Sequence, residues 1–187
     1  MKEFNVAIIG QIAKWKGQDI FIKAAKQLHS KFPKARFLII GDVLFDKVED
    51  KVYKSHLIEL ANDCKYIEFL GHRNDVQELI KDMDLIVHAS TREEPFGRVI
   101  IEGMAAKKPV IASGIGGPVE IIENGVNGIL YKPGDIDALQ ISIEKVLTDR
   151  VLYKELCDNG YKNFVNRFEI HRTVKEVENV ILGFSKE

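Results

Sequence analysis

The chain has 187 residues, which is enough for a single domain with a substantial core. With 45% hydrophobic and 29% charged residues, its composition is that of a globular protein and excludes a disordered or fibrous class. The 27 lysines and arginines nearly cancel the 28 aspartates and glutamates, so the overall charge gives no reason to expect a nucleic-acid partner.

Short apolar runs rich in valine and isoleucine recur along the chain, with helical patterns between them. The predicted strands are NVAIIG (5–10), RFLIIGD (36–42), YIEFLG (66–71), DLIVHAS (84–90), KPVIAS (108–113) and NGILY (127–131). The predicted helices span about 18–31, 52–63, 76–83, 96–106, 118–123, 135–149, 151–168 and 171–184. This alternation predicts an α/β fold, a Rossmann-like doubly wound parallel sheet of about six strands with helices on both faces and further helices at the C-terminus.

No linker, repeat or low-complexity tract divides the chain, so residues 1–187 are expected to form one domain. The two cysteines, Cys64 and Cys157, match no metal-ligand spacing and are interpreted as packing residues. The N-terminal sequence runs directly into a strand pattern without a signal-peptide core. We therefore expect a cytoplasmic protein, and any peripheral attachment to the cytoplasmic membrane face would depend largely on a longer chain.

In an open parallel sheet, ligands bind beyond the carboxyl ends of the strands, so the loops at that edge are the candidate sites. In the first of them, Gly10 ends a strand, Lys14 and Lys16 follow, and Gly17 precedes a helix. Lysines at a strand end suit a phosphate group. A solvated surface turn that carries lysines by chance is an equally open interpretation.

The second loop, EEPFGR, leads into the helix expected at 96–106. Pro95 disfavours helical dihedrals at Glu94 and suits a first helical turn, so Glu94 is predicted at or near the N-cap. The free amides of Phe96, Gly97 and Arg98 would then point outward at the positive end of the helix dipole. This arrangement predicts an anion site.

Glu102 lies on the same side of that helix as Arg98, while apolar and small residues cover the rest. One interpretation is an Arg98–Glu102 ion pair on a solvated strip, which contributes about 0.2–0.5 kcal/mol at best. The other interpretation is that the two central strands that flank the helix in the sequence should enclose it. A buried Glu102 carboxylate would then need hydrogen-bond partners, such as the hydroxyl groups of a ligand. We favour this second interpretation, a ligand site.

The third loop, SGIGGPVE, places several glycines before a helix opened by Pro118. Val119 stands where the dinucleotide fingerprint G-x-G-x-x-G needs its third glycine, so a nicotinamide site is weakly supported. Another glycine-lined helix N-terminus remains, with Glu120 in its first turn. The fourth loop, FLGHRND, ends a strand whose backbone groups could meet the edge of a base.

Two longer stretches carry a family resemblance. EPFGRVIIEGMA, with seven residues between Glu94 and Glu102, and KPVIASGIGGPVEIIENGVNGILYKPGD closely resemble the C-terminal, donor-binding domain of GT-B fold retaining glycosyltransferases of family 4, the group 1 glycosyl transferases. GQIAKWKGQDIFIKAA resembles the first strand and helix of the same domain, so the resemblance covers nearly the whole chain in order.

The resemblance implies that the chain binds a nucleotide-diphosphate sugar without an obligatory metal or other cofactor. A hexose would pass from a UDP- or GDP-linked donor, such as GDP-mannose, to an unknown acceptor, a glycan or a lipid-linked sugar. Complete enzymes of this family carry an acceptor domain of comparable size before this one. The chain is therefore expected to be the donor half, with the acceptor bound mainly by an N-terminal domain that is absent from it.

The same resemblance assigns roles to residues of the loops. Glu102 would hold the ribose hydroxyls, Glu94 would contact the donor sugar, and Lys16 would meet the diphosphate, with Glu94 and Lys16 as the catalytic pair. The backbone around His72 and Arg73 falls where the base is usually received. The expected donor-binding residues are Gly10, Gln11, Lys16, His72, Arg73, Glu94, Phe96, Gly97, Arg98 and Glu102.

Gln11 departs from the family pattern, which has arginine at this position, and one fixed positive charge is thereby removed from the diphosphate site. This departure keeps open a noncatalytic nucleotide or nucleotide-sugar binding module. A second alternative is a glycoside hydrolase that uses Glu94 and Glu102 as its acid and base. Their expected separation of about 9 Å or more lies at or beyond the upper limit for an inverting pair.

Overall fold

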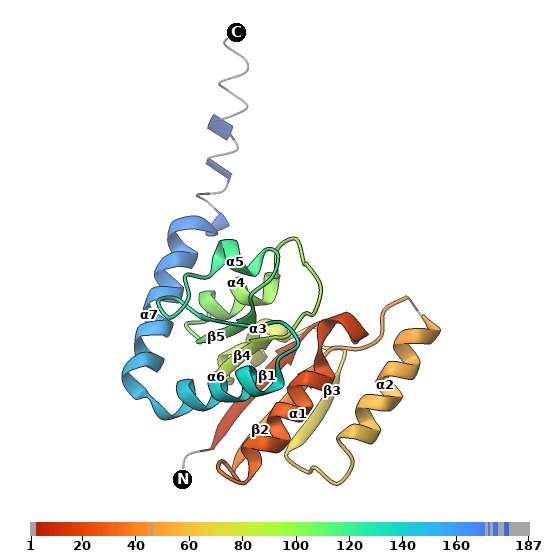
Figure 1. The fold of residues 1–187 in the computed structure, drawn as a ribbon. Helices are drawn as coiled ribbons and strands as arrows, with labels where there is room; N and C mark the ends of the chain where they lie inside the picture. The colour runs from red at the N-terminus through yellow and green to blue at the C-terminus, as the bar shows by residue number, and fades with distance from the viewer. Residues whose placement is uncertain (1–2, 46, 171, 173, 176–177, 180–187) are drawn as a thin grey trace.

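The computed structural model describes residues 3–45, 47–170, 172, 174–175 and 178–179. The strands are β1 (Phe4–Ile9), β2 (Ala35–Ile40), β3 (Ile67–Gly71), β4 (Leu85–His88), β5 (Val110–Ser113) and β6 (Ile129–Tyr131). The helices are η1 (Lys14–Lys16), α1 (Gln18–His29), α2 (Val48–Leu60), α3 (Val76–Lys81), α4 (Arg98–Ala105), α5 (Pro118–Ile121), α6 (Ile136–Thr148) and α7 (Arg150–Arg167). Figure 1 shows their arrangement.

The six strands form one parallel sheet in the order β3-β2-β1-β4-β5-β6. This is the strand order of a doubly wound Rossmann-type sheet, in which the direction of winding reverses between β1 and β4. The predicted fold class is confirmed. The reversal matters for function because the loops that follow β1 and β4 leave the sheet in opposite directions and open a crevice between them.

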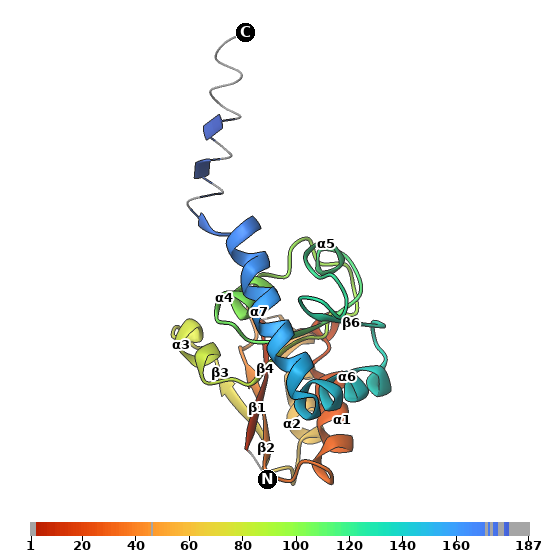
Figure 2. The ribbon, with the colours of Figure 1, turned by 90° about the vertical axis from the view of Figure 1, so that its left-hand side faces the viewer.

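The sheet is covered on both faces, so its strands are apolar on both sides. On one face, Val6 of β1 and Phe37 of β2 pack under α1, α2 and α6, and on the other, Ala7 and Leu38 pack under α3 and α4. Figure 2 shows the sheet edge-on with these two helical layers on its two sides. This explains why the central strands contain continuous apolar runs, such as residues 6–9 and 37–40, and do not alternate between apolar and polar residues.

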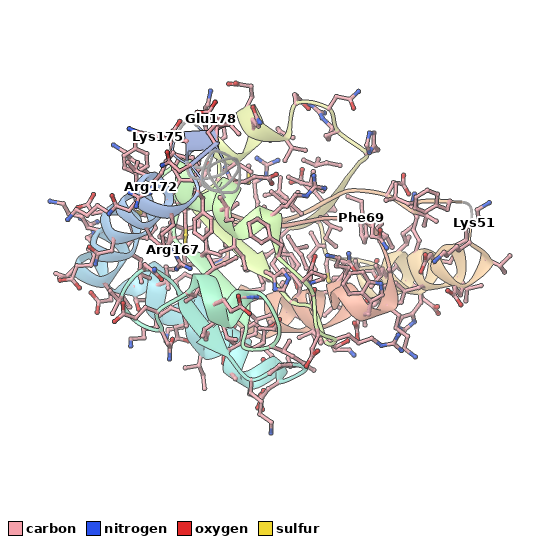
Figure 3. The ribbon with its side chains drawn as sticks, turned by 90° about the horizontal axis from the view of Figure 1, so that it is seen from above. Lys51, Phe69, Arg167, Arg172, Lys175 and Glu178 are labelled. Atoms are coloured by element: carbon pink, nitrogen blue, oxygen red, sulfur yellow. The ribbon has the colours of Figure 1, made fainter. Side chains whose placement is uncertain are left out.

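The last described helix, α7, runs along the side of the domain and contributes to both layers. Leu156 belongs to the core under α6, whereas Phe164 packs against the core under α4. At its C-terminal end, Arg167 donates two hydrogen bonds of 3.1 Å to the carbonyl oxygen of Glu120 (Figure 3). The C-terminal helix is thereby tied to the short helix α5.

Two helices begin two or more residues away from where they were expected. α2 begins at Val48 instead of 52, after an extended Lys47, and the acidic residues Glu49 and Asp50 of its first turn are favourable at the positive end of a helix dipole. α4 begins at Arg98 instead of Phe96, for a reason given below. The helix expected over 171–184 lies largely outside the described residues, and those described there, 172, 174–175 and 178–179, are helical.

Within the part of the chain that the structure describes, no helix combines the length and the apolarity that a bilayer crossing requires.

Candidate functional site

A cavity of about 640 Å³ opens at the carboxyl edge of the sheet, at the point where the winding reverses. Figure 3 looks down on this edge of the sheet. The cavity is lined from β1 and the loop after it by Ile9, Gly10, Gln11, Trp15 and Lys16; from β2, β3, their loops and the start of α3 by Ile40, Gly41, Asp42, Leu44, His72, Arg73 and Val76; and from the loop after β4 and from α4 by Glu94 to Val99 and Glu102. The structure therefore brings all ten predicted donor-binding residues to one cavity. What each of them binds stays a prediction.

The loop after β1 is fastened to the loop after β4 by close backbone contacts. The amide of Thr91 donates a 2.7 Å hydrogen bond to the carbonyl oxygen of Trp15. Gly17, which separates η1 from α1, has a φ of +70°. A Cβ at Gly17 would lie 2.1 Å from the carbonyl oxygen of Ala89, so only glycine allows the two loops to meet this closely. This contact fixes where Lys16 emerges.

Lys16 points across the crevice and meets Glu94. Its Nζ atom lies 2.5 Å from Oε1 of Glu94, and the two side chains are only 17% and 16% exposed. The same Nζ atom lies 4.3 Å from the centre of the Trp15 ring, within the range of a cation–π contact. Lys14, by contrast, is exposed and does not line the cavity. Of the two lysines of the loop, only Lys16 faces the site.

The second oxygen of Glu94 is held by two polar residues from the end of β4. Its Oε2 atom lies 2.7 Å from Nε2 of His88 and accepts a 2.9 Å hydrogen bond from the hydroxyl of Ser90. Burial alone would raise the pKa of Glu94, but the hydrogen bonds from His88 and Lys16 outweigh it and lower the pKa to about 2. Glu94 is therefore a carboxylate at neutral pH, with a partner on each oxygen.

The expectation that Glu94 caps the following helix is wrong. The N-cap of α4 is Gly97, which has left-handed backbone dihedrals of +64° and +56°. A residue with a side chain strongly disfavours these dihedrals, which explains why the position is a glycine. Because the helix begins only after Gly97, Pro95 lies in the loop before the first turn and is not part of it. Phe96 therefore lies outside the first turn, which begins at Arg98. The amide of Ile100 already donates a 3.0 Å hydrogen bond to the carbonyl oxygen of Gly97, so the amides left at the positive end of the helix are those that precede Ile100.

The expected anion site is displaced by about one turn but keeps its place beside the cavity. Arg98 is exposed, Glu102 is half-buried, and both line the cavity. Within the described part of the chain, no hydrogen bond or ion pair joins Arg98 to Glu102 or engages the Glu102 carboxylate. The structure therefore gives no support to the interpretation of a surface salt bridge, and it leaves the Glu102 carboxylate open to the cavity.

The remaining predicted residues lie at the opposite wall and at the floor of the cavity. His72 and Arg73 are exposed, and the guanidinium of Arg73 is bound to the carboxylate of Asp75 at 2.7 and 2.5 Å. Gln11 accepts a 2.8 Å hydrogen bond at its backbone oxygen from the buried side chain of Gln18. The main-chain position of Gln11 is thus fixed independently of what its own side chain binds.

The glycine loop after β5 was expected to line a ligand site, but it lies outside the cavity. Gly114, Gly116 and Gly117 do not line the cavity. The amide of Gly117 instead donates a 2.7 Å hydrogen bond to the carbonyl oxygen of Glu94. The loop supports the EEPF segment from behind, and the interpretation of a second glycine-lined ligand site is not supported.

Sequence reasoning missed three buried polar residues around Glu94. His88 is 4% exposed, and Ser90 and Ser113 are fully buried. All three stand at the carboxyl ends of predicted strands, in VHAS and VIAS, where the strand pattern alone gives them no separate role. A histidine and two serines that end apolar runs at this edge were the available signal, because buried polar side chains need hydrogen-bond partners.

Among the described residues, no group of three or more histidine, cysteine, aspartate or glutamate side chains is placed to hold a metal ion. That donor binding needs no metal stays a prediction.

Known proteins resemble the chain in both sequence and fold. The family model "Glycosyl transferases group 1" matches residues 1–163. MJ1178 of Methanocaldococcus jannaschii, described as an uncharacterized glycosyltransferase, is 34% identical over 95% of this chain and 48% of its own length. CapM of Staphylococcus aureus, a capsular polysaccharide biosynthesis glycosyltransferase, is 29% identical over 98% of this chain and 47% of its own. The chain thus spans about half the length of the curated relatives it matches.

Solved structures agree with the sequence comparison. Alr3699/HepE of Anabaena, crystallised with UDP and glucose, superposes with a TM-score of 0.88 and 32% identity over 96% of this chain and 48% of its own. The C-terminal domain of the group 1 glycosyl transferase LpcC from Francisella tularensis superposes with a TM-score of 0.78 and 29% identity, and the match covers 89% of this chain and 87% of that domain. The fold is therefore that of the C-terminal domain of GT-B glycosyltransferases, and the chain belongs to the group 1 glycosyl transferases.

Proposed function

We propose that this chain is the donor-binding half of a retaining glycosyltransferase that takes a hexose from a UDP- or GDP-linked sugar. The observation that carries the proposal is the cavity itself, which gathers all ten predicted donor-binding residues around a Lys16–Glu94 ion pair. A crevice at the switch point of a doubly wound sheet is also where this architecture binds nucleotides.

Each part of the donor is assigned to a different set of groups that line the cavity. The diphosphate lies near Lys16 and the first-turn amides of α4, where a cation and a helix N-terminus both favour an anion. The ribose hydroxyls donate to Glu102, and the base lies against the backbone around His72 and Arg73. The sugar reaches Glu94. UDP is the first carrier to test, because the similar Alr3699/HepE was crystallised with UDP-glucose.

Catalysis in this proposal is mainly electrostatic. Lys16 and the helix amides stabilise the negative charge that develops on the departing diphosphate, while the cavity holds the sugar for attack on the same face. No protein nucleophile is assigned. No metal or other cofactor is needed in this scheme, since the protein itself supplies the positive charge.

The hydrolase alternative fits the site less well. A glycoside hydrolase needs one carboxylic acid that stays protonated near neutral pH. The pKa of Glu94 is lowered to about 2 because the hydrogen bonds from His88 and Lys16 outweigh the effect of burial, so Glu94 could serve only as the base of such a pair, and both of its oxygens are already engaged by protein groups. The noncatalytic binding module stays the second candidate, favoured by Gln11 at the position where the family has arginine.

The acceptor is proposed to bind mainly to the half of the enzyme that precedes this domain in full-length relatives. We therefore expect the 187-residue chain to bind a nucleoside diphosphate weakly and to transfer no sugar by itself. Robust transfer to an added acceptor by the purified chain would contradict this division of labour. A cytoplasmic location, with any membrane attachment supplied by the rest of the protein, belongs to the same proposal.

The decisive experiment is calorimetric titration of the chain with UDP, GDP and ADP, each with and without EDTA. We expect one of the first two to bind, EDTA to have no effect, and Lys16→Gln to weaken binding about ten-fold through loss of a charged hydrogen bond. Lys14→Gln removes the same charge two residues away, outside the cavity, and should leave the affinity unchanged. Equal losses in both variants would mean that Lys16 contributes only general charge, and no binding of any nucleotide would reject the proposal.

A further inference from the structure

His88 is a buried histidine whose two ring nitrogens both have partners. It ends β4, is 4% exposed, and lies directly behind Glu94 as seen from the cavity, which it does not itself line. Its Nε2 atom is 2.7 Å from Oε2 of Glu94 and 3.1 Å from the hydroxyl of Ser90. Its Nδ1 atom is 3.3 Å from the hydroxyl of Ser113.

The hydrogen-bond partners determine where the ring carries its proton. A carboxylate can only accept hydrogen bonds, so the nitrogen that faces it, Nε2, must be the donor. Ser113 is then free to donate its hydroxyl proton to Nδ1. Ser90 donates to the same oxygen of Glu94 as His88 does. A His88 ring that is protonated at Nε2 therefore has a hydrogen-bond partner at each nitrogen, Glu94 at Nε2 and Ser113 at Nδ1.

Glu94 depends on this support because nothing in its local backbone fixes its side chain. It lies in the irregular loop between β4 and α4, and the helix that follows begins only after the left-handed Gly97. Lys16 holds one carboxylate oxygen from across the crevice, and His88 and Ser90 hold the other from below. The ion pair with Lys16 alone would leave the carboxylate free to rotate about a single contact.

We infer that His88 is a positioning residue for the donor sugar, which aims the Glu94 carboxylate into the cavity through its Nε2–H group while Ser113 selects the ring tautomer. This inference rests on the proposed function, because it assumes that Glu94 meets the sugar. It adds an inner layer to the site, built from the ends of β4 and β5, that does not line the cavity. Removal of His88 should therefore affect the sugar and leave the nucleotide alone.

Two substitutions of similar polarity distinguish positioning from simple packing. In His88→Gln, the side-chain amide can reach the place of Nε2 and still donate to Glu94. In His88→Asn, the shorter side chain places its amide near Nδ1 and Ser113, out of reach of Glu94. If His88 serves only the packing of the fold, both variants should be impaired to a similar degree. If His88 orients the Glu94 carboxylate, His88→Gln should retain this function and His88→Asn should lose it.

The test is calorimetric titration of the wild-type chain and both variants with UDP-glucose and with UDP. We expect wild type to prefer UDP-glucose over UDP, His88→Gln to keep most of that preference, and His88→Asn to lose about ten-fold in affinity for UDP-glucose. The affinities of wild type and the two variants for UDP should lie within about two-fold of one another, and thermal unfolding should show that all three proteins are folded. The inference is overturned if wild type has no preference for the sugar conjugate, if both variants lose equally, or if UDP binding falls in parallel.

The ring itself provides a measurement that needs no ligand. In long-range proton–nitrogen NMR spectra, we expect His88 of the free wild-type chain to show the Nε2–H tautomer. Ser113→Ala should shift the ring toward a mixture of tautomers. A ring protonated only at Nδ1 in wild type would overturn the inference even if the nucleotide binds. If the chain binds no nucleotide but the Nε2–H tautomer and its dependence on Ser113 are found, the proposed function fails while His88 still positions Glu94.

Discussion

Gly17 and Ala89 touch through their backbones, with no room between them for a single methyl group. A Cβ at Gly17 would lie 2.1 Å from the Ala89 carbonyl oxygen and 3.0 Å from its carbonyl carbon. This contact sets the width of the crevice, because Lys16 stands immediately before Gly17 and the EEPF loop that carries Glu94 begins a few residues after Ala89.

Gly17→Ala should therefore damage the site and the fold together. The left-handed backbone costs about 1–2 kcal/mol for any side chain, and the overpacking adds about 1–3 kcal/mol. Gly125→Ala is the matched control, since Gly125 has a φ of +79° but a Cβ there would meet nothing within 4 Å. Chemical denaturation should show a loss in Gly17→Ala clearly larger than in Gly125→Ala. Equal losses would mean that the two loops can separate at little cost.

The low pKa of Glu94 makes part of the stability depend on pH. Against burial, which raises it, the hydrogen bonds from His88 and Lys16 lower the pKa of Glu94 from 4.5 to about 2 in the folded chain. A depressed folded pKa contributes stability that is fully present above the unfolded value and is lost as the pH falls toward the folded value. Between pH 5 and 3, wild type should therefore lose stability that Glu94→Gln does not lose.

Melting temperatures of the two proteins across this pH range provide the measurement. Glu155→Gln, at an exposed position of α7, controls for the removal of one charge and should follow wild type. A constant difference between wild type and Glu94→Gln from pH 5 to 3 would show that the Glu94 carboxylate is not held in its ionised form.

Glu102→Gln should weaken nucleotide binding and leave the fold intact. The carboxylate lines the cavity without forming the expected pair with Arg98 in the described part of the chain, so its loss breaks no ion pair with that residue. If it accepts hydrogen bonds from the ribose hydroxyls, the substitution costs roughly 1.5–3 kcal/mol of binding, about ten-fold or more in affinity. A 2′,3′-dideoxy nucleotide is the control, since wild type should lose affinity for it and Glu102→Gln should lose much less. Similar losses in both proteins would rule out the ribose assignment.

Gln11→Arg should tighten binding of the nucleoside diphosphate. The side chain borders the cavity in the same loop as Lys16, and a guanidinium would add a permanent charge with a planar pair of donors for phosphate oxygens. The gain should be largest at low ionic strength and should shrink as salt screens the charge. Titrations at two salt concentrations, with Gln77→Arg on the exposed face of α3 as the control, measure it. Unchanged affinity at low salt would mean that residue 11 does not face the phosphates.

The sheet and most helices could be predicted because the pattern that encodes them is local. Strands buried on both faces, such as β2 and β4, are continuous apolar runs, and the helices between them repeat apolar residues at helical spacing. The position of Lys16 and Glu94 at one edge followed from the parallel topology. Neither required knowledge of individual contacts.

The start of α4 could not be predicted from the same rules because two local preferences compete there. Pro95 is well suited to a first helical turn, and Gly97 is well suited to a left-handed N-cap. The structure takes the second, with Gly117 binding the carbonyl oxygen of Glu94 and holding the loop off the helix axis. That bond comes from a segment far along the chain, and a local pattern carries no information about it.

The layer behind Glu94 was missed for a related reason. His88 and Ser113 stand on neighbouring strands, and the alignment of β4 with β5 brings their ends together. A sequence reveals that each is polar at the end of an apolar run, but the distance between them depends on strand register. Register is decided by packing of the whole sheet.

Because β1 pairs with β4 across the winding reversal, the crevice is formed by segments that lie far apart in the sequence. The residues at its two walls, Lys16 and Glu94, are 78 positions apart, and two of the three strands between them in the sequence, β2 and β3, lie on the other side of β1 from β4. During synthesis, the first three strands can assemble and cover one edge of β1 while its other edge waits for β4. Closing that long loop is entropically costly and comes late. If the crevice binds a nucleotide as proposed, the nucleotide can bind only after β4 and α4 have joined β1, and it then stabilises the assembled domain without assisting the early steps of folding.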